Sequence, residues 1–225
     1  MAVLKRVAGR IPTGAKVLDV GCATGRVTEA LLELVSDGRV VAIDASQEMV
    51  DLACERLGDR ARVWRQDVLD LVLEEPVDAV VSTAALHWVP DHDRLWQRLA
   101  AALRCGGILE IQCGGQGNID RVREVIDAVA AQSFPELEGW SPWVFAGPRE
   151  TQARLQAAGF TSVRCWLEER PTRPENLADF VRSSILPAHM ARLPKQRREP
   201  FAAAVLERVS EPLDYVRLNV SAVKA

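Results

Sequence analysis

The sequence predicts an α/β protein with seven strands in a mostly parallel sheet, helices on both faces and an antiparallel last strand. Two observations lead to this prediction. Short apolar runs alternate along the chain with segments of helical periodicity, as expected for parallel strands joined by crossover helices. Small residues stand where the first strand meets the first helix. A chain of 225 residues is long enough to bury its own core as one domain.

The predicted elements follow from hydrophobic periodicity, with a period of two for strands and 3.6 for helices. Strands are predicted at residues 15–21, 39–44, 61–67, 77–82, 106–113, 161–169 and 214–225, and helices at 26–35, 46–57, 91–104, 148–158, 175–186 and 200–210. Gly159 is placed to end the fourth helix. In the last strand Val216, Leu218 and Val220 alternate with polar neighbours, so we expect a half-buried antiparallel strand at or near the sheet edge.

Charge and cysteine content exclude several classes of function. Lys and Arg total 28 against 31 Asp and Glu, so no basic footprint for nucleic acid or an anionic membrane is expected. The five cysteines show no metal-ligand spacing, which predicts free thiols in a reducing compartment and no metal site. The N-terminus lacks the apolar core of a signal peptide, and no apolar run approaches the length of a membrane span. We therefore expect a cytoplasmic protein, and the sequence indicates no oligomeric state.

The segment "VLDVGCATGRVTEAL" carries the strongest functional pattern. Asp19 ends the first strand, a turn of small residues follows, and Asp44 ends the second strand 19 residues after Gly25. Taken singly, each feature is also what a tight strand–helix turn or a solvated helix cap would show. A nicotinamide-dependent oxidoreductase is the rival class, but it would need the spacing G-x-G-x-x-G, and here the spacing is G-x-A-x-G.

The chain resembles the class I S-adenosylmethionine-dependent methyltransferases, strongly over about residues 14–113, with a seven-stranded Rossmann-like sheet. S-adenosylmethionine has no phosphate, and it needs an acid near its ammonium group and another for its ribose hydroxyls. The resemblance implies that the turn from Asp19 to Gly25 wraps the methionine part, that Asp44 binds the ribose, and that Asp67 meets the adenine amino group. Ala23 departs from the glycine found in many members. The full set of implied cofactor-binding residues is Asp19, Gly21, Cys22, Ala23, Gly25, Asp44, Ala45, Met49, Asp67, Val68, Ser82 and Thr83.

The resemblance also predicts the organisation of the single domain. Residues 1–113 would form the core that binds S-adenosylmethionine and releases S-adenosylhomocysteine, and residues 114–147 an insertion or lid. Residues 148–225 would complete the sheet and carry a helical cap at 174–210. Members of the family usually have some twenty or more residues before the first helix, whereas this chain begins at "MAVLKRV". We expect the absence of such a segment to weaken substrate capture more than cofactor binding.

The loop "STAALHWVPD" leaves the fourth strand beside the expected position of the methyl-donor sulfur. Methyltransferases that act on nucleic-acid bases carry a run like N-P-P-Y at this place, and this chain has Ser82 to Ala85 instead. The block from Val77 to Gln112 resembles the small-molecule branch, closest to the trans-aconitate methyltransferases. It is also similar to the malonyl-thioester O-methyltransferase of biotin synthesis and to the juvenile hormone acid methyltransferases. Those enzymes esterify carboxylic acids, so a small acidic metabolite is the expected substrate.

His87 and Trp88 are the candidate catalytic residues of this loop. An indole N–H donates without competing as a nucleophile, so Trp88 suits one carboxylate oxygen and His87 a second hydrogen bond. Both side chains reach one pocket only if the loop turns there, which Pro90 and Asp91 favour. O-, N- or C-methylation of a neutral natural product is the alternative, with His87 as general base. The alternative without a functional role is core packing for Trp88 and a surface or hydrogen-bonded structural position for His87.

The sequence leaves other features of the substrate site open. An arginine can bind a second substrate carboxylate, although most helical arginines simply face solvent. The candidates are Arg182, Arg192, Arg197 and Arg198. Trp140, Trp143 and Phe145 would either wall the pocket or pack the lid. A third class of function is a fold that binds the cofactor without turnover.

Overall fold

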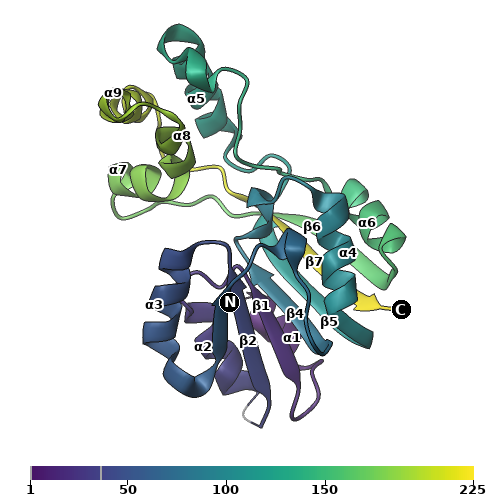
Figure 1. The fold of residues 1–225 in the computed structure, drawn as a ribbon. Helices are drawn as coiled ribbons and strands as arrows, with labels where there is room; N and C mark the ends of the chain where they lie inside the picture. The colour runs from purple at the N-terminus through teal and green to yellow at the C-terminus, as the bar shows by residue number, and fades with distance from the viewer. Residues whose placement is uncertain (1, 36) are drawn as a thin grey trace.

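A computed structural model describes residues 2–35 and 37–225, and its centre is a seven-stranded sheet (Figure 1). The strands lie in the order β3-β2-β1-β4-β5-β7-β6. Their bounds are β1 Lys16–Val20, β2 Arg39–Asp44, β3 Arg62–Arg65, β4 Val77–Thr83, β5 Leu103–Gly114, β6 Phe160–Glu169 and β7 Val216–Lys224. Strands β1 to β5 pair in parallel, and β7 pairs antiparallel with β5 and β6. The predicted seven-stranded, mostly parallel sheet with an antiparallel last strand is confirmed.

Strand β7 lies inside the sheet, and the outermost position belongs to β6. Strand β7 pairs with β5 along Ile108 to Gly114 and with β6 along Phe160 to Glu169. This position explains why its apolar residues Val220 and Ala222 are fully buried. The period-two pattern predicts one buried face, and it carries no information on whether a strand has one neighbour or two.

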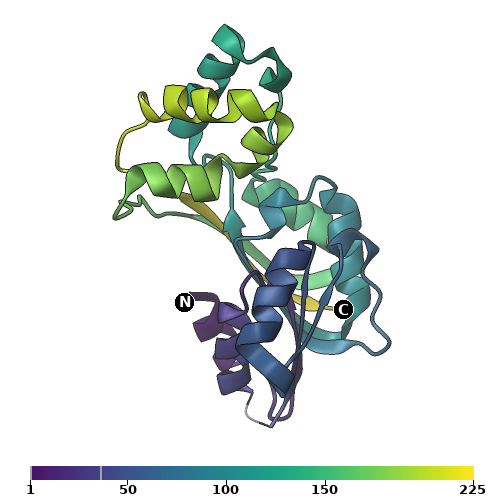
Figure 2. The same ribbon diagram turned by 60° about the vertical axis from the view of Figure 1, so that its left-hand side comes forward.

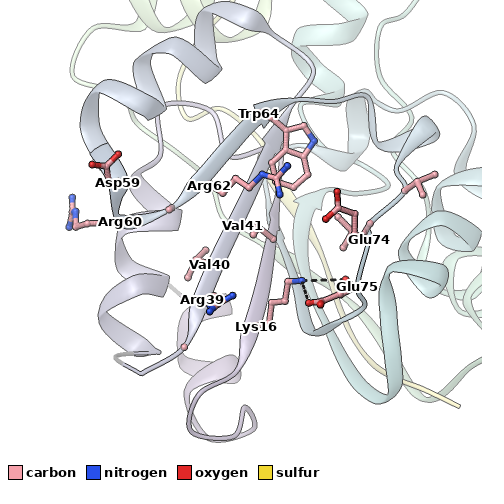
Figure 3. A pocket seen from close by; sticks show the side chains of 14 residues that line it. Lys16, Arg39, Val40, Val41, Asp59, Arg60, Arg62, Trp64, Glu74 and Glu75 are labelled. Carbon is pink, nitrogen blue, oxygen red and sulfur yellow. Dashed lines mark hydrogen bonds and ion pairs between the residues drawn. The ribbon is translucent and has the colours of Figure 1, made fainter.

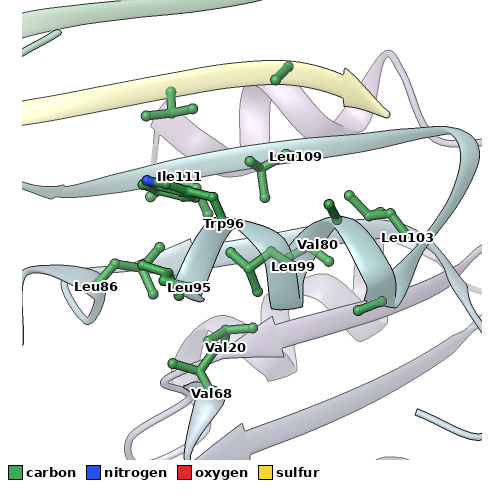
Figure 4. Packing of buried hydrophobic residues seen from close by; sticks show 14 of the residues in the cluster. Val20, Val68, Val80, Leu86, Leu95, Trp96, Leu99, Leu103, Leu109 and Ile111 are labelled. Carbon is green, nitrogen blue, oxygen red and sulfur yellow. The ribbon is translucent and has the colours of Figure 1, made fainter. Parts of the chain in front are cut away.

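Helices cover both faces of the sheet. Their bounds are α1 Ala2–Ala8, α2 Arg26–Leu34, α3 Gln47–Leu57, α4 His92–Ala102, α5 Asp120–Ser133, α6 Pro148–Ala157, α7 Leu177–Phe180, α8 Pro187–Arg192 and α9 Lys195–Leu206. Helices α1, α2 and α3 lie on one face, and α4 and α6 cover the other. The inner strands are apolar on both faces, as sheets covered on both sides require. Figure 4 shows Leu95, Trp96 and Leu99 of α4 packed over Leu109 and Ile111 of β5.

Helices α5, α7, α8 and α9 form a separate group beyond the carboxyl ends of the parallel strands (Figures 1 and 2). They share one hydrophobic cluster, in which the rings of Phe134 and Phe201 meet edge to face at 5.2 Å. We call this group the helical cap. It joins residues from the predicted insertion (114–147) with residues from the predicted cap (174–210), so the two segments pack as one unit. The proposed domain boundaries stay a prediction.

The cap differs from the sequence prediction in its details. The helix predicted at 175–186 is the single turn α7 followed by a π-helical segment, Val181–Ile185. The helix predicted at 200–210 is α9, which begins at Lys195 and contains Pro200 in its interior. The prediction began this helix at residue 200 because the apolar periodicity that defines its buried face starts at Phe201. Helices α1, α5 and α8 were not predicted. No helix in the described part of the chain is long and apolar enough to cross a membrane.

A buried ion pair holds α1 against the sheet. Glu110 of β5 is wholly buried, and its carboxylate accepts hydrogen bonds from Arg6 Nε at 2.6 Å and from Arg10. The Ser221 hydroxyl of β7 donates to the same carboxylate at 2.6 Å. A buried carboxylate is tolerated when it is paired and fully hydrogen-bonded, so these contacts join α1, β5 and β7 into one unit.

Replacement of Glu110 tests this connection. Glu110→Ala leaves two arginines next to a buried gap, and we expect a loss of about 3–5 kcal/mol in the free energy of unfolding. Urea unfolding followed by circular dichroism measures the loss. Glu75→Ala is the control, because Glu75 is 79% exposed in its pair with Lys16 and should change stability by about 1 kcal/mol or less. Equal effects of the two variants would contradict a structural role for the buried pair.

Candidate active site

The carboxyl ends of β1, β2 and β4 open onto a cavity of about 500 Å³, which we call the first cavity. This is where open α/β sheets bind their ligands. Its volume lies within the range of small-molecule sites. Of the residues predicted from the sequence, eight line it: Gly21, Ala23, Asp44, Ala45, Asp67, Val68, Thr83 and Trp88. Ile43, Leu69 and Leu86 supply apolar wall.

The turn after β1 has a left-handed backbone at three positions. Gly21, Ala23 and Gly25 have φ values of 72°, 47° and 78°. The N–H groups of Gly21 and Cys22 both donate to the carbonyl oxygen of Ile43, at 2.8 and 3.0 Å, which fixes the turn to β2. A Cβ added at Gly21 would lie 2.2 Å from the Cβ of Ala85. Glycine is therefore needed here for space as well as for conformation.

Asp44 joins this turn to the next helix. Its Oδ2 accepts the N–H of Ala23 and its Oδ1 the N–H of Ser46, both at 2.9 Å. Each carboxylate oxygen keeps a further lone pair, so the side chain can still accept from a diol. Asp67 is similar, because its Oδ1 accepts the N–H of Leu69 at 2.8 Å. Two carboxylates are thus held in fixed orientations on the wall of the first cavity.

Asp19 directly precedes Val20 and Gly21, which line the first cavity, but it is not itself part of the lining and its side chain is buried. The Thr28 hydroxyl donates to its Oδ2 at 2.7 Å, and its Oδ1 has no partner among residues 2–35 and 37–225. Burial raises the pKa of Asp19 to about 7, the Thr28 hydrogen bond lowers it, and the charge of Asp44 raises it further. An orphaned carboxylate oxygen at this place is what a ligand with an ammonium group would balance.

Besides Asp19, four of the predicted cofactor residues lie outside the lining of the first cavity, and their contacts with a cofactor stay predictions. Cys22 packs behind the turn against Ala53 and Leu57, and burial raises the pKa of its thiol to about 12. The Ser82 hydroxyl donates to the carbonyl of Val20 at 2.7 Å, which joins β4 to β1. The remaining two take part in local structure, where Gly25 precedes α2 and the N–H of Met49 donates to the Ser46 side chain.

The loop after β4 makes the turn that the sequence required. Residues Leu86–Trp88 form one turn of 3₁₀ helix, and Ala84 before it has a φ of 57°. The turn buries His87 and leaves Trp88 40% exposed. Ala84 and Trp88 line both the first cavity and a neighbouring cavity of about 230 Å³, which we call the second cavity. The two spaces therefore meet at this loop.

The protonation of His87 follows from its surroundings. The N–H of Gly114 donates to His87 Nδ1 at 3.2 Å, so Nδ1 is unprotonated and the proton of the neutral ring is on Nε2. Burial, followed by the positive charge of Arg217, lowers the pKa of His87 to about 3. The imidazole is neutral at pH 7, and its remaining polar group is a hydrogen-bond donor.

Aromatic side chains wall the second cavity. The ring centroids of Trp143 and Trp88 are 5.7 Å apart. Trp143 also stacks on Phe145, with 5.7 Å between ring centroids and an interplanar angle of 11°. Trp140, in contrast, packs inside the cap against His189 and Arg192. Trp143 and Phe145 thus wall the pocket, whereas Trp140 packs within the cap. The residues that line the second cavity are Ala84, His87, Trp88, Asn118, Ile119, Trp143, Phe145, Ser184, Ile185, Tyr215 and Arg217.

The four arginines suggested as anion ligands contact other parts of the cap. Arg182 pairs with Glu199, and Arg197 pairs with Glu136 at 2.6 Å. Arg192 and Arg198 donate to the carbonyl oxygens of Glu136 and Leu193, at 3.0 and 3.1 Å. None of them lines the second cavity. The arginine that does is Arg217 of β7, which the sequence interpretation missed because its alternation pattern marks it only as a polar strand residue.

A larger hollow of about 620 Å³ lies at the amino ends of β1, β2 and β3 (Figure 3). Lys16 and Glu75 pair across it at 3.3 Å, and Arg62 stacks on Trp64. None of the residues predicted from the sequence as site residues lines it. It lies at the opposite end of the strands from the ligand position of this fold class, so the first and second cavities are the candidate active site.

Comparison with known proteins agrees with this geometry. Residues 17–107 match the model of a methyltransferase domain. A trans-aconitate 2-methyltransferase from Rhodococcus jostii (strain RHA1) is 34% identical over 168 residues, which cover 73% of this chain and 64% of that relative. One from Mycolicibacterium gilvum (strain PYR-GCK) is 38% identical over 135 residues, 60% of this chain and 51% of the relative. The chain thus spans between half and two thirds of the length of these relatives.

Solved structures share the fold along nearly the whole chain. The YcgJ protein of Bacillus subtilis matches with a TM-score of 0.70 at 16% identity, covering 99% of this chain and 98% of that one. The phosphoethanolamine N-methyltransferase 2 of Haemonchus contortus, solved with S-adenosylhomocysteine, matches with a TM-score of 0.66 at 20% identity. That match covers 99% of this chain and 51% of the Haemonchus chain.

The class I S-adenosylmethionine-dependent methyltransferases share this order of strands, the glycine turn after β1 and acids at the positions of Asp44 and Asp67. This chain belongs to that family. Among its members, the chain is similar to the trans-aconitate 2-methyltransferases named above. The first cavity fits S-adenosylmethionine in volume and donor set, with Asp44 and Asp67 on its wall and the buried, unpartnered oxygen of Asp19 two residues before Gly21 of that wall.

The close approach at Gly21 gives a direct test of the first cavity. Gly21→Ala forces its Cβ onto Ala85, so one of the two loops must move, and we expect binding of S-adenosylhomocysteine to weaken at least about tenfold. Isothermal titration calorimetry measures the change. Gly58→Ala is the matched control, since Gly58 also has a positive φ, 53°, but open space around its Cβ. If both variants bind equally well, the contact between the loops does not shape the cavity.

The raised pKa of Asp19 predicts a pH-dependent cost in stability. An acid whose folded pKa is about 7, against 3.8 for the unperturbed group, holds its proton more tightly in the native state. The native state therefore loses stability as pH rises from about 4 to about 7, and no more above that. We expect Asp19→Asn to be more stable than wild type by a few kcal/mol at pH 8, with the two converging toward pH 4. Urea unfolding across this range checks it, and parallel curves would contradict the assignment.

Proposed function

We propose that this chain transfers the methyl group of S-adenosylmethionine to a carboxylate oxygen of a small acid. The observation that carries the proposal is the state of His87. Its Nδ1 is occupied by the N–H of Gly114, and its pKa is lowered to about 3. A side chain in this state donates a hydrogen bond but does not take up a proton. The site is therefore suited to an acceptor that is already ionised.

The cofactor would occupy the first cavity. Asp44 would accept hydrogen bonds from the ribose hydroxyls and Asp67 from the adenine amino group, while the turn at Gly21 faces the methionine part. The ammonium group would balance the buried charge of Asp19. S-adenosylmethionine supplies an electrophilic methyl group, which a carboxylate oxygen accepts in line with the breaking C–S bond. What the protein adds is orientation and partial removal of water.

The acceptor would occupy the second cavity. Trp88 lines both cavities and His87 lines the second, so we assign the Trp88 indole N–H and the His87 Nε2–H as the donors to the acceptor carboxylate. Neither group competes with the acceptor as a nucleophile at neutral pH. At about 230 Å³ the space is smaller than the about 300–1,000 Å³ of pockets for drug-sized ligands. The relatives named trans-aconitate 2-methyltransferase agree with a small carboxylic acid as substrate.

Methylation of a neutral alcohol, phenol or amine is the alternative, and it assigns His87 as the general base. A base needs an unprotonated nitrogen that faces the acceptor and a pKa near the working pH. The unprotonated nitrogen of His87 faces Gly114 instead. The geometry therefore favours the acid over the neutral acceptor.

The decisive experiment measures release of S-adenosylhomocysteine over matched acceptors, with each carbon scaffold offered as the acid, the alcohol and the amine. Turnover confined to the acids supports the proposal. Turnover of alcohols or amines replaces it with the His87-base mechanism. Binding of S-adenosylhomocysteine without turnover of any acceptor identifies a cofactor-binding protein that does not perform the reaction.

His87→Asn separates the donor role from the base role. The Asn oxygen can replace Nδ1 as acceptor for Gly114, while the distal N–H donor is lost. We expect kcat/KM for an acid to fall about 10–100-fold, the value of one hydrogen bond to a charged group, with unchanged thermal stability. We also expect wild-type kcat at saturating S-adenosylmethionine to be independent of pH between about 6 and 8. A rate that rises with pH through a single ionisation in this range would contradict the donor role.

A further inference from the structure

Arg217 is the basic side chain that lines the second cavity. It lies on β7 directly opposite Gly114 of β5, the residue whose N–H binds His87. Its guanidinium carbon stacks over the ring of Tyr215, 4.4 Å from the ring centroid. Arg217 lines the second cavity and is absent from the lining of the first. Its charge is thus placed on the acceptor side of the site.

Arg217 has no carboxylate partner in the described part of the chain. The nearest acid by register is Glu168, which faces Arg217 across the β6–β7 pair. The Glu168 carboxylate is bound instead by Arg170, whose Nη2 lies 2.7 Å from Oε1. Burial lowers the pKa of Arg217, which reports the cost of holding this charge half-buried. A cation kept in a cavity without a counter-ion is typical of a site for an anionic ligand.

Further donors line the second cavity together with Arg217. Asn118 accepts the N–H of Val216 through Oδ1 at 2.9 Å, and this contact leaves its amide NH₂ to donate elsewhere. Ser184 brings a hydroxyl from the cap. A carboxylate is an acceptor-only group with two oxygens, and an arginine matches both at once through its planar fork.

We propose that Arg217 determines the acceptor specificity by binding a carboxylate that is not the one methylated. The inference rests on the proposed function and extends it to the charge of the acceptor. The methyl group would arrive from the first cavity at the wall formed by Ala84 and Trp88, whereas Arg217 belongs to the second cavity alone. A bidentate arginine on the reacting carboxylate would withdraw the lone pairs needed for attack, so the reacting group is better served by the single donors of His87 and Trp88.

The test compares dicarboxylic acids of four to six carbons with their half-amides, which keep the shape and lose one charge. Wild type should prefer the diacid. Arg217→Gln should lower kcat/KM for the diacid about 10–100-fold and leave the half-amide within about threefold. Arg217→Lys should lie between, because it keeps the charge and loses the fork. Equal losses on both substrates, or no loss, would overturn the proposal.

Two control variants exclude indirect effects. Arg182→Gln removes a cap arginine that pairs with Glu199 outside the cavity and should leave the preference for the diacid unchanged. Glu168→Gln tests whether Arg217 only balances its cross-strand neighbour. If Glu168→Gln changes the preference as much as Arg217→Gln does, Arg217 has a structural role and the proposal fails.

A binding measurement separates this proposal from the proposed function. Calorimetric titration of a diacid and its half-amide into the protein saturated with S-adenosylhomocysteine requires no turnover. Weaker binding of the diacid to Arg217→Gln, with unchanged binding of the half-amide, supports the anion site even if no acid is methylated. Turnover of acids with equal diacid affinity in wild type and variant retains carboxyl methylation and overturns the role of Arg217. Failure of wild type to bind either compound also overturns it.

Discussion

The contact between Gly21 and Ala85 is the constraint on which the candidate site depends. It brings the turn after β1 against the loop after β4 with no room for one more carbon atom. The turn is fixed to β2 through Ile43 and Asp44, and the loop continues into His87 and Trp88. The loop also lies between the two cavities, because its residues Ala84 and Trp88 line both of them. A shift at the junction would change the space for both ligands at once.

The charges of the two cavities are complementary to the two proposed ligands. The acidic residues Asp44 and Asp67 line the first cavity, where a cationic cofactor would lie, and the buried Asp19 stands two residues before Gly21 of the same wall. The basic Arg217 lines the second cavity, where an anionic acceptor would lie. His87 lines the second cavity as a neutral donor. This arrangement separates the positive sulfonium from the positive guanidinium, and it favours an acceptor carboxylate directed from one toward the other.

The parts of the site that the sequence predicted are local in the chain. The turn at Gly21 and the acid Asp44 stand close together in a pattern whose meaning depends on a strand and the helix that follows it. The seven strands and the antiparallel last strand were also predicted from the sequence. Hydrophobic periodicity reports which segments are strands but not their order in the sheet, and the structure supplies that order. Arg217 was missed because its neighbour His87 is 130 positions earlier, and only the register of β5 against β7 brings them together. The sequence suggested the cap arginines as anion ligands for the same reason. Periodicity does not show that Arg182 pairs with Glu199 and Arg197 with Glu136.

The interior position of β7 separates the two halves of the site in the order of synthesis. The first cavity is built entirely from residues between Val20 and Pro90, so a nascent chain carries all of its wall before half of the protein has been made. The second cavity requires Tyr215 and Arg217, and it closes only when β7 enters between β5 and β6. Pairing of Ile111 with Val220 closes a loop of more than a hundred residues, which is the slow kind of contact in folding. A chain still emerging from the ribosome would thus gain the wall for the methyl donor well before it gained the means to choose an acceptor.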